Sequence, residues 1–280
     1  MKRTGPRRCA ALLSLLLLFL LPVAALPADT LEVHFIDVGQ GASVLLRTDE
    51  TAILVDAGNG NHAARYLEQV GVRRLDLVIA THGHADHIGG FPAVFDTVPV
   101  SEIWYNGQTH TTLTFERFID TVLTSDARYR EPRRGDRIEL EELSITVLHP
   151  EGSAVDYRGH LHDKNIVVRA DYREFSVVLT GDAETPVEQE ILARPLPVAA
   201  TALKLGHHGS RTSSSMEFLR AVNPKILVYQ AGRNNRYGHP HPEVITRVRR
   251  LPGAQLYGTD LHGTIVITTD GYRWQVTSER

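Results

Sequence analysis

Residues 81–90 read Thr-His-Gly-His-Ala-Asp-His-Ile-Gly-Gly, and any fold of this chain must accommodate the chemistry of that segment. His82 and His84 are two positions apart, so on an extended loop their imidazoles point to the same side and can share one metal ion. Asp86 and His87 leave the loop in a different direction and suit a second ion. Nitrogen and carboxylate ligands without thiolates favour zinc, manganese or iron with open positions for water. Because this run directly follows an apolar stretch, it predicts a metal site rather than a His-rich surface turn.

The first 25 residues have the pattern of a secretory signal peptide. Lys2, Arg3, Arg7 and Arg8 form a positive head, residues 10–21 form an apolar core, and small residues stand at 24 and 25. The core is too short for a comfortable membrane span, so an uncleaved anchor is the alternative interpretation. The pattern predicts a secreted or periplasmic protein with no stable membrane span after cleavage. The only cysteine, Cys9, lies inside this segment, so the mature chain would have no disulfide.

Cleavage would also change the charge, because all four charges of the segment are positive. The formal net charge of −3 becomes −7 for the mature chain. An acidic protein is not built for indiscriminate binding to nucleic acid, whose phosphates favour a basic surface. A local basic cluster is still available in the C-terminal half, although its last three members also fit an ordinary solvated helix face. The cluster comprises Lys204, Arg211, Arg233, Arg236, Arg247, Arg249 and Arg250.

The remaining residues, 26–280, contain no linker, low-complexity tract or composition break, which predicts one domain. Apolar and alternating runs bounded by turn residues predict a strand-rich chain with interspersed helices, and thus two packed sheets covered by helices on the outside. Strands are expected at 31–37, 43–47, 52–56, 75–80, 137–140, 145–148, 166–171, 175–180, 202–205, 226–229, 264–268 and 273–276, and helices near 62–70, 214–221 and 243–251.

Further candidate ligands stand where predicted strands end. Strand 175–180 runs into Gly181-Asp182, and strand 202–205 leads to His207-His208-Gly209-Ser210. Loops at strand ends are where a rigid scaffold presents chemistry. Each motif alone is a weak signal, but their order after the first cluster is a strong one.

In this order the motifs resemble the metallo-β-lactamase superfamily, and within it the hydrolase domain of ComEC-type competence proteins. The resemblance covers nearly all of the chain after the signal segment. It rests on Phe35-Ile36-Asp37-Val38-Gly39-Gln40-Gly41, Val55-Asp56-Ala57-Gly58, the His-x-His-x-Asp-His motif of 81–90, Leu-Thr-Gly-Asp-Ala-Glu at 179–184, His-His-Gly-Ser at 207–210, Tyr237-Gly238-His239-Pro240 and Thr259-Asp260.

The resemblance implies an α/β fold, a four-layer αβ/βα sandwich, with two divalent metal ions at one edge. Zinc is the expected metal and manganese the alternative. His82 and His84 would bind the first ion and Asp86 and His87 the second, with Asp182 bridging them. His208 is expected to complete the second site, with His207 beside it as a catalytic candidate.

A third histidine on the first metal is implied but not fixed by the motifs. His162 is the first choice, followed by His160 and then by His149 in Leu-His-Pro. The alternative is that all three are loop histidines and that water completes the site.

Two such ions would lower the pKa of a shared water, giving a hydroxide nucleophile, and would clamp the substrate oxygens. Asp86 is expected to accept a proton as well as to bind metal. His239 and Tyr237 are candidates to protonate the leaving group or to hold a phosphate oxygen, although Tyr-Gly-His-Pro can also be a simple turn. Ser210 joins them as a substrate-binding candidate. Asp37 and Asp56 are expected in turns or as carboxylates that orient a ligating imidazole.

These features predict a secreted two-metal hydrolase, with a phosphodiester as the expected substrate and DNA as a candidate source of it. One alternative is hydrolysis of a cell-wall phosphoester, a lactone or a β-lactam. Another is a non-catalytic protein that binds DNA or assists its uptake. Fold class does not decide among them, and the pattern is silent on the oligomeric state.

Overall fold

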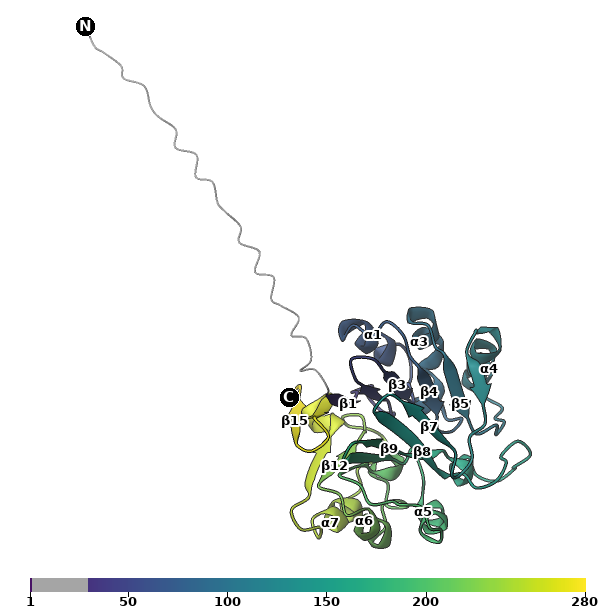
Figure 1. The fold of residues 1–280 in the computed structure, drawn as a ribbon, viewed down its shortest axis with the longest axis vertical. Helices are drawn as coiled ribbons and strands as arrows, with labels where there is room; N and C mark the ends of the chain where they lie inside the picture. The colour runs from purple at the N-terminus through teal and green to yellow at the C-terminus, as the bar shows by residue number, and fades with distance from the viewer. Residues whose placement is uncertain (2–29) are drawn as a thin grey trace.

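The computed structural model describes Met1 and residues 30–280. In this part of the chain, two mixed sheets pack face to face and helices cover the outer face of each (Figure 1). The arrangement is the predicted four-layer αβ/βα sandwich. The predicted signal segment and the domain boundary after residue 25 fall on residues outside this description.

The first sheet has the strand order β15-β14-β1-β2-β3-β4-β5-β6. Its members are β1 (Leu31–Phe35), β2 (Val44–Arg47), β3 (Ala52–Val55), β4 (Leu77–Ala80), β5 (Glu102–Tyr105), β6 (Arg128–Arg130), β14 (Ile265–Thr269) and β15 (Trp274–Ser278). The strands from β15 to β3 pair antiparallel, and those from β3 to β6 pair parallel.

The second sheet has the order β13-β12-β11-β10-β9-β8-β7 and repeats this change of direction. Its members are β7 (Arg137–Leu140), β8 (Leu143–His149), β9 (Val167–Tyr172), β10 (Phe175–Leu179), β11 (Ala202–Lys204), β12 (Ile226–Tyr229) and β13 (Gln255–Gly258). The strands from β7 to β10 pair antiparallel, and those from β10 to β13 pair parallel.

The longer helices form the two outer layers, and the short ones lie in the loops that follow strands. Those over the first sheet are α1 (His62–Gln69), α3 (Phe91–Thr97) and α4 (Leu113–Thr124), and those over the second are α5 (Thr185–Leu192), α6 (Met216–Val222) and α7 (Pro242–Val248). The short segments are α2 (Ala85–Ile88), α8 (Thr259–His262), η1 (Leu161–Lys164) and η2 (Gly206–Gly209). Within the described residues no helix is both long and apolar enough to cross a bilayer.

Three layers of buried apolar side chains hold these elements together. One lies between the sheets, with Val33 and Leu77 from the first and Val168 and Val177 from the second. The second lies under α1, α3 and α4, and the third under α5, α6 and α7. Because parallel strands are covered on both faces, β4, β10, β11 and β12 are buried along their whole length.

Each predicted strand and helix overlaps an observed one, so those predictions are confirmed. The sequence pattern predicts no element between residues 91 and 130, where the structure contains helix α3, strand β5, helix α4 and strand β6. Strand β5 has no apolar alternation to identify it, because it begins with the buried Glu102, whose carboxylate accepts a hydrogen bond from Trp104 Nε1 at 2.5 Å. Helix α5 and strand β13 were also not predicted.

Candidate metal centre

The predicted ligands meet at one edge of the sandwich, at the carboxyl ends of parallel strands. Strand β4 leads to His82, strand β10 leads to Asp182, and strand β11 leads to the pair His207-His208. Ligand sites of open α/β sheets lie at this edge, because loops from adjacent parallel strands converge there. Segments far apart in the sequence are thereby brought into contact.

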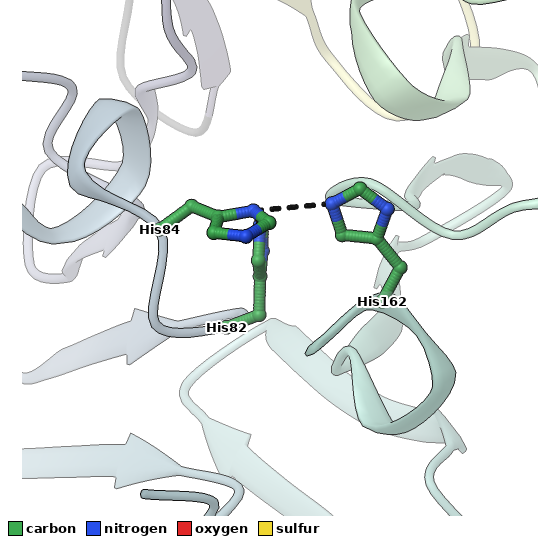
Figure 2. A group of neighbouring side chains, drawn as sticks. All are labelled: His82, His84 and His162. Carbon is green, nitrogen blue, oxygen red and sulfur yellow. Dashed lines mark hydrogen bonds between the residues drawn. The ribbon is translucent and has the colours of Figure 1, made fainter. Parts of the chain in front are cut away.

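His82, His84 and His162 form the first group of candidate ligands (Figure 2). Nδ1 of His84 lies 3.0 Å from Nε2 of His82 and 3.1 Å from Nε2 of His162. Figure 2 shows that His82 and His84 come from the loop after β4, whereas His162 reaches across from η1. His82 and His162 are buried.

Burial keeps these three rings neutral. It lowers the pKa of His84 to about 4 and that of His162 to about 4, and it lowers the pKa of His82 well below its ordinary value. A neutral imidazole has one N–H and one lone pair, so three converging ring nitrogens cannot all satisfy one another. Such a set of nitrogen donors fits a divalent cation.

Asp86, His87 and His208 form the second group. Nε2 of His208 lies 3.3 Å from Nε2 of His87 and 3.3 Å from Oδ2 of Asp86. Burial raises the pKa of Asp86, but the hydrogen bond with His208 and the charge of His87 outweigh it, so the carboxyl titrates well below its usual range. Nδ1 of His208 lies 2.8 Å from the carbonyl oxygen of Gln230 and donates to it, leaving Nε2 for a metal.

Asp182 lies between the two groups. Its carboxylate is 3.2 Å from Nε2 of His87 and 3.4 Å from Nε2 of His208 on one side. On the other side it is 3.9 Å from Nε2 of His82 and 3.7 Å from Nε2 of His162. Since a buried carboxylate needs positive partners, this position fits a ligand shared by two cations.

The groups are held by the loops after β1 and β3. Asp56 contacts the His87 imidazole at 2.7 Å and accepts hydrogen bonds from the backbone and hydroxyl of Thr81, as an orienting carboxylate would. A Cβ at Gly41 would collide with the backbone oxygen of Asp86, so only glycine permits this close packing. Asp37 is a turn residue, and its carboxylate pairs with Arg280 at 3.0 Å.

His207 and His208 both have positive φ, at 44° and 55°, which is costly for residues with a Cβ. This tight turn points the two imidazole rings in different directions. Nε2 of His207 faces Asp182 at 3.8 Å, and Nδ1 lies 2.9 Å from Oε1 of Glu184. His208 thus lies in the second ligand group, and His207 lies beside it.

Glu184 was not predicted to have a role. It also lies 3.5 Å from Nδ1 of His162, and it accepts a hydrogen bond from the hydroxyl of Thr212 at 2.8 Å. His162, Glu184 and His207 therefore form a further cluster next to the two groups. The Leu-Thr-Gly-Asp-Ala-Glu motif contains Glu184, but spacing alone does not show which side chain it contacts.

The three alternatives for the last histidine are placed differently. His162 belongs to the first group. His160 is exposed, and its ring centroid lies 6.3 Å from that of His84. His149 is buried, 2.6 Å from the carbonyl oxygen of Asn165 through Nδ1 and 3.4 Å from Glu190 through Nε2. Among the described histidines, neither His149 nor His160 is part of a ligand group with His82 and His84.

A pocket of about 350 Å³ opens over the two groups. Asp86, His207, His239 and Tyr237 line it, whereas Ser210 is buried with its hydroxyl 2.9 Å from that of Thr212. Five other lining residues have no role predicted from the sequence: Gln40, Ala85, His110, Thr112 and Thr114. Gln40 lies within a motif that was recognised, but the last three belong to the region without predicted elements.

The expected basic cluster is only partly available to a ligand. Lys204 is buried and donates to the carbonyl oxygen of Gly181 at 2.9 Å, so its proposed role in nucleic-acid binding is wrong. Arg247 is half-buried and donates to the carbonyl oxygens of Ser213 and Arg211. The remaining members, Arg211, Arg233, Arg236, Arg249 and Arg250, are exposed.

Residues 36–233 match the sequence family described as the metallo-beta-lactamase superfamily. The chain belongs to that superfamily. The side chains of both ligand groups and Asp182 lie within the matched range.

The curated relatives include ComEC-type competence proteins. ComE operon protein 3 of Bacillus subtilis is 29% identical over 84% of this chain and 32% of its own length. Competence protein ComA of Neisseria gonorrhoeae is 34% identical over 86% of this chain and 33% of its own length. The chain thus spans about a third of these relatives. A partial match to ribonuclease Z of Methanopyrus kandleri is 28% identical over 41% of this chain and 42% of that protein.

Solved structures support the fold assignment. The metallo-beta-lactamase fold protein YhfI from Bacillus subtilis superposes with a TM-score of 0.55 at 15% identity, covering 86% of this chain and 100% of that one. At this identity the likeness concerns the fold alone.

Proposed function

We propose that this protein is a secreted two-metal phosphodiesterase. The observation that carries the proposal is the position of Asp182 between two groups of imidazole and carboxylate ligands, beneath an open pocket. Similarity to competence proteins, and over a shorter stretch to ribonuclease Z, favours a phosphodiester over other substrates. The predicted signal segment supports action outside the cytoplasm.

His82, His84 and His162 would hold one divalent ion, and Asp86, His87 and His208 would hold the other, with the Asp182 carboxylate available to both. The imidazole-rich donor set favours zinc, and the two carboxylates leave manganese as the alternative. When bound, such ions supply Lewis acidity that lowers the pKa of water and polarises phosphoryl oxygens.

The protein's own groups then position and protonate the reactants. The low pKa of Asp86 keeps its carboxylate ionised, so it can accept a hydrogen bond from an attacking water. Glu184 accepts from Nδ1 of His207 and so directs Nε2 of that ring toward the centre. Burial, together with the neighbouring His208, lowers the pKa of His239 to about 4, so at neutral pH it offers an N–H donor without a charge.

Tyr237 lies at the mouth of the pocket, 48% exposed, with the guanidinium of Arg236 over its ring. Tyr237 and His239 stack with their centroids 5.7 Å apart, so the two side chains form one wall. If the phosphodiester is part of a nucleic acid, binding should weaken steeply with salt and depend on Arg233 and Arg236.

The test is turnover of bis(nitrophenyl) phosphate by the full chain supplied with zinc or manganese. Asp182→Ala should lower the rate by orders of magnitude, because two-metal activation requires both ions in register. Asp120→Ala, which removes an exposed carboxylate on α4, is the matched control and should retain the rate.

Other outcomes distinguish the remaining functions. Turnover of a chromogenic β-lactam without phosphodiester turnover would refute the substrate class and leave the metal centre standing. Retention of DNA without turnover, in protein shown to hold two metals, would favour a binding protein over an enzyme.

A further inference from the structure

A second cavity, of about 390 Å³, lies beside the pocket over the ligand groups. His84 and His110 line both, so the two spaces are neighbours. The wall of the second cavity comes from residues 108–110 and 157–161. None of the proposed catalytic steps takes place in this second cavity.

The two loops that build this cavity are tied to each other. The amide of Gln108 donates to the carbonyl oxygen of Gly159 at 3.4 Å, and that of Asn106 donates to the carbonyl oxygen of Lys164 at 2.8 Å. Arg158 Nη1 donates to the hydroxyl of Thr109 at 3.3 Å. Gln108 and Asn106 are buried, and Gln108 itself lines the cavity, so the cross-links fix the shape of its wall.

The lining favours an anion. Arg158 supplies a positive charge at any pH, and Thr109, His110 and His160 supply hydrogen-bond donors in either protonation state. Of the described residues that line the cavity, none is Asp or Glu. Asp163, the carboxylate within the same loop, is already engaged, since it accepts from the Tyr157 hydroxyl at 2.7 Å and from the His160 backbone at 3.1 Å.

We infer that the second cavity binds the phosphate that neighbours the scissile phosphodiester in the same strand. The substrate would then be a chain with two or more phosphates, which crosses the metal centre with one phosphate in each space. The inference rests on the proposed phosphodiesterase function, because it assigns a position to a second part of the same substrate. Arg158 is its charged contact and Thr109 its hydroxyl contact.

The experiment compares kcat/KM for the thymidine trinucleotide, with two internal phosphates, and the dinucleotide, with one. In the metal-loaded full chain the ratio, taken per cleavable bond, should be about tenfold, the gain expected from one charge-assisted hydrogen bond. Arg158→Gln should bring the ratio close to one, and Thr109→Val should lower it less. Arg65→Gln, which removes an exposed arginine on α1 away from both spaces, should keep the tenfold ratio.

A wild-type ratio near one would overturn the inference, as would a ratio that Arg158→Gln leaves unchanged or that Arg65→Gln lowers equally. In each of these cases cleavage of the dinucleotide keeps the phosphodiesterase function intact. Wild-type protein that cleaves neither nucleotide nor bis(nitrophenyl) phosphate would instead refute the proposed function itself.

Discussion

Oδ2 of Asp56 lies 2.7 Å from Nδ1 of His87, on the opposite side of the ring from Asp182. The carboxylate therefore accepts a hydrogen bond from Nδ1–H, and Nε2 is left free to face the metal centre. Asp56 has a positive φ of 59°, an uncommon conformation that directs the carboxylate back under the loop after β4. Carboxylates in this position fix the tautomer and orientation of a ligating imidazole.

Asp56→Asn should weaken metal binding in the second group by about 10- to 100-fold. An amide has only one acceptor oxygen, so it cannot accept all the hydrogen bonds that His87 and Thr81 donate to the carboxylate. Metal titration and bis(nitrophenyl) phosphate turnover measure the effect. Asp37→Asn is the control, since Asp37 occupies a surface turn and pairs with Arg280. Full metal affinity in Asp56→Asn would show that the contact is only structural.

His84→Ala should remove most of one metal ion and abolish activity while leaving the fold largely intact. Its Nδ1 is the atom that both His82 and His162 approach, so the first group loses its centre. Metal analysis after gel filtration should give close to two ions for the parent protein and close to one for the variant. A variant that retains both ions would refute the assignment.

Alanine substitutions of the three loop histidines separate the candidates for the last ligand. His162→Ala should lose metal and rate together. His160→Ala should retain both, because its ring is exposed at the edge of the site. His149→Ala should keep the metal but lower the melting temperature, since it leaves the carbonyl oxygen of Asn165 without its donor. Damage from His160→Ala alone would shift the ligand two residues upstream.

The sequence could predict the proximity of the candidate ligands that lie in compact motifs. His82, His84, Asp86 and His87 occupy one loop and one helical turn, so their proximity is local and follows from spacing. Asp182 and His208 could be placed by resemblance, because each follows a buried strand. The contacts between Glu184 and His207, and between His110 and His84, could not be predicted, since they depend on how separate loops meet.

The sequence pattern also could not predict which charged side chains are buried. Lys204 stands between Leu203 and Leu205 and was interpreted as a surface cation. Its strand, β11, lies inside the second sheet with layers on both faces, so no side chain of the strand reaches solvent. Tertiary context, rather than local alternation, decided its environment.

Lys204→Met should consequently affect stability and not nucleic-acid binding. The ammonium donates to the carbonyl oxygen of Gly181, the residue before Asp182, and its loss removes one of the two hydrogen bonds that this oxygen accepts, the other coming from the His207 amide at 3.2 Å. We expect the free energy of unfolding to fall by about 1–3 kcal/mol, measured by urea denaturation. The salt dependence of any DNA binding should stay the same, whereas Arg236→Gln should reduce its slope. An altered slope in Lys204→Met would contradict the buried position.

The free energy of unfolding of the metal-free protein should depend on pH, because the histidines of the first ligand group are neutral in the folded state. An unfolded histidine titrates near 6.5, whereas burial lowers the pKa of His84 to about 4 and lowers that of His82 and His162 as well. Between these values the unfolded chain binds more protons than the folded one, so the free energy of unfolding decreases as pH falls from about 6.5 to 4. His208 acts in the opposite sense, because Asp182 and Asp86 raise its pKa despite burial, and the stability it contributes is lost as pH rises.

The measurement is urea unfolding of chelator-treated protein across that range, for the parent chain, His84→Gln and His62→Gln. His84→Gln should reduce the slope below pH 6.5 by about one proton, or about 1.4 kcal/mol per pH unit, because the variant removes one group that only the unfolded state protonates. His62 lies exposed at the start of α1, and its substitution serves as the matched control. An equal slope in His84→Gln and the parent chain would mean that His84 is protonated in the folded metal-free protein, and so would contradict the converging arrangement of neutral imidazoles.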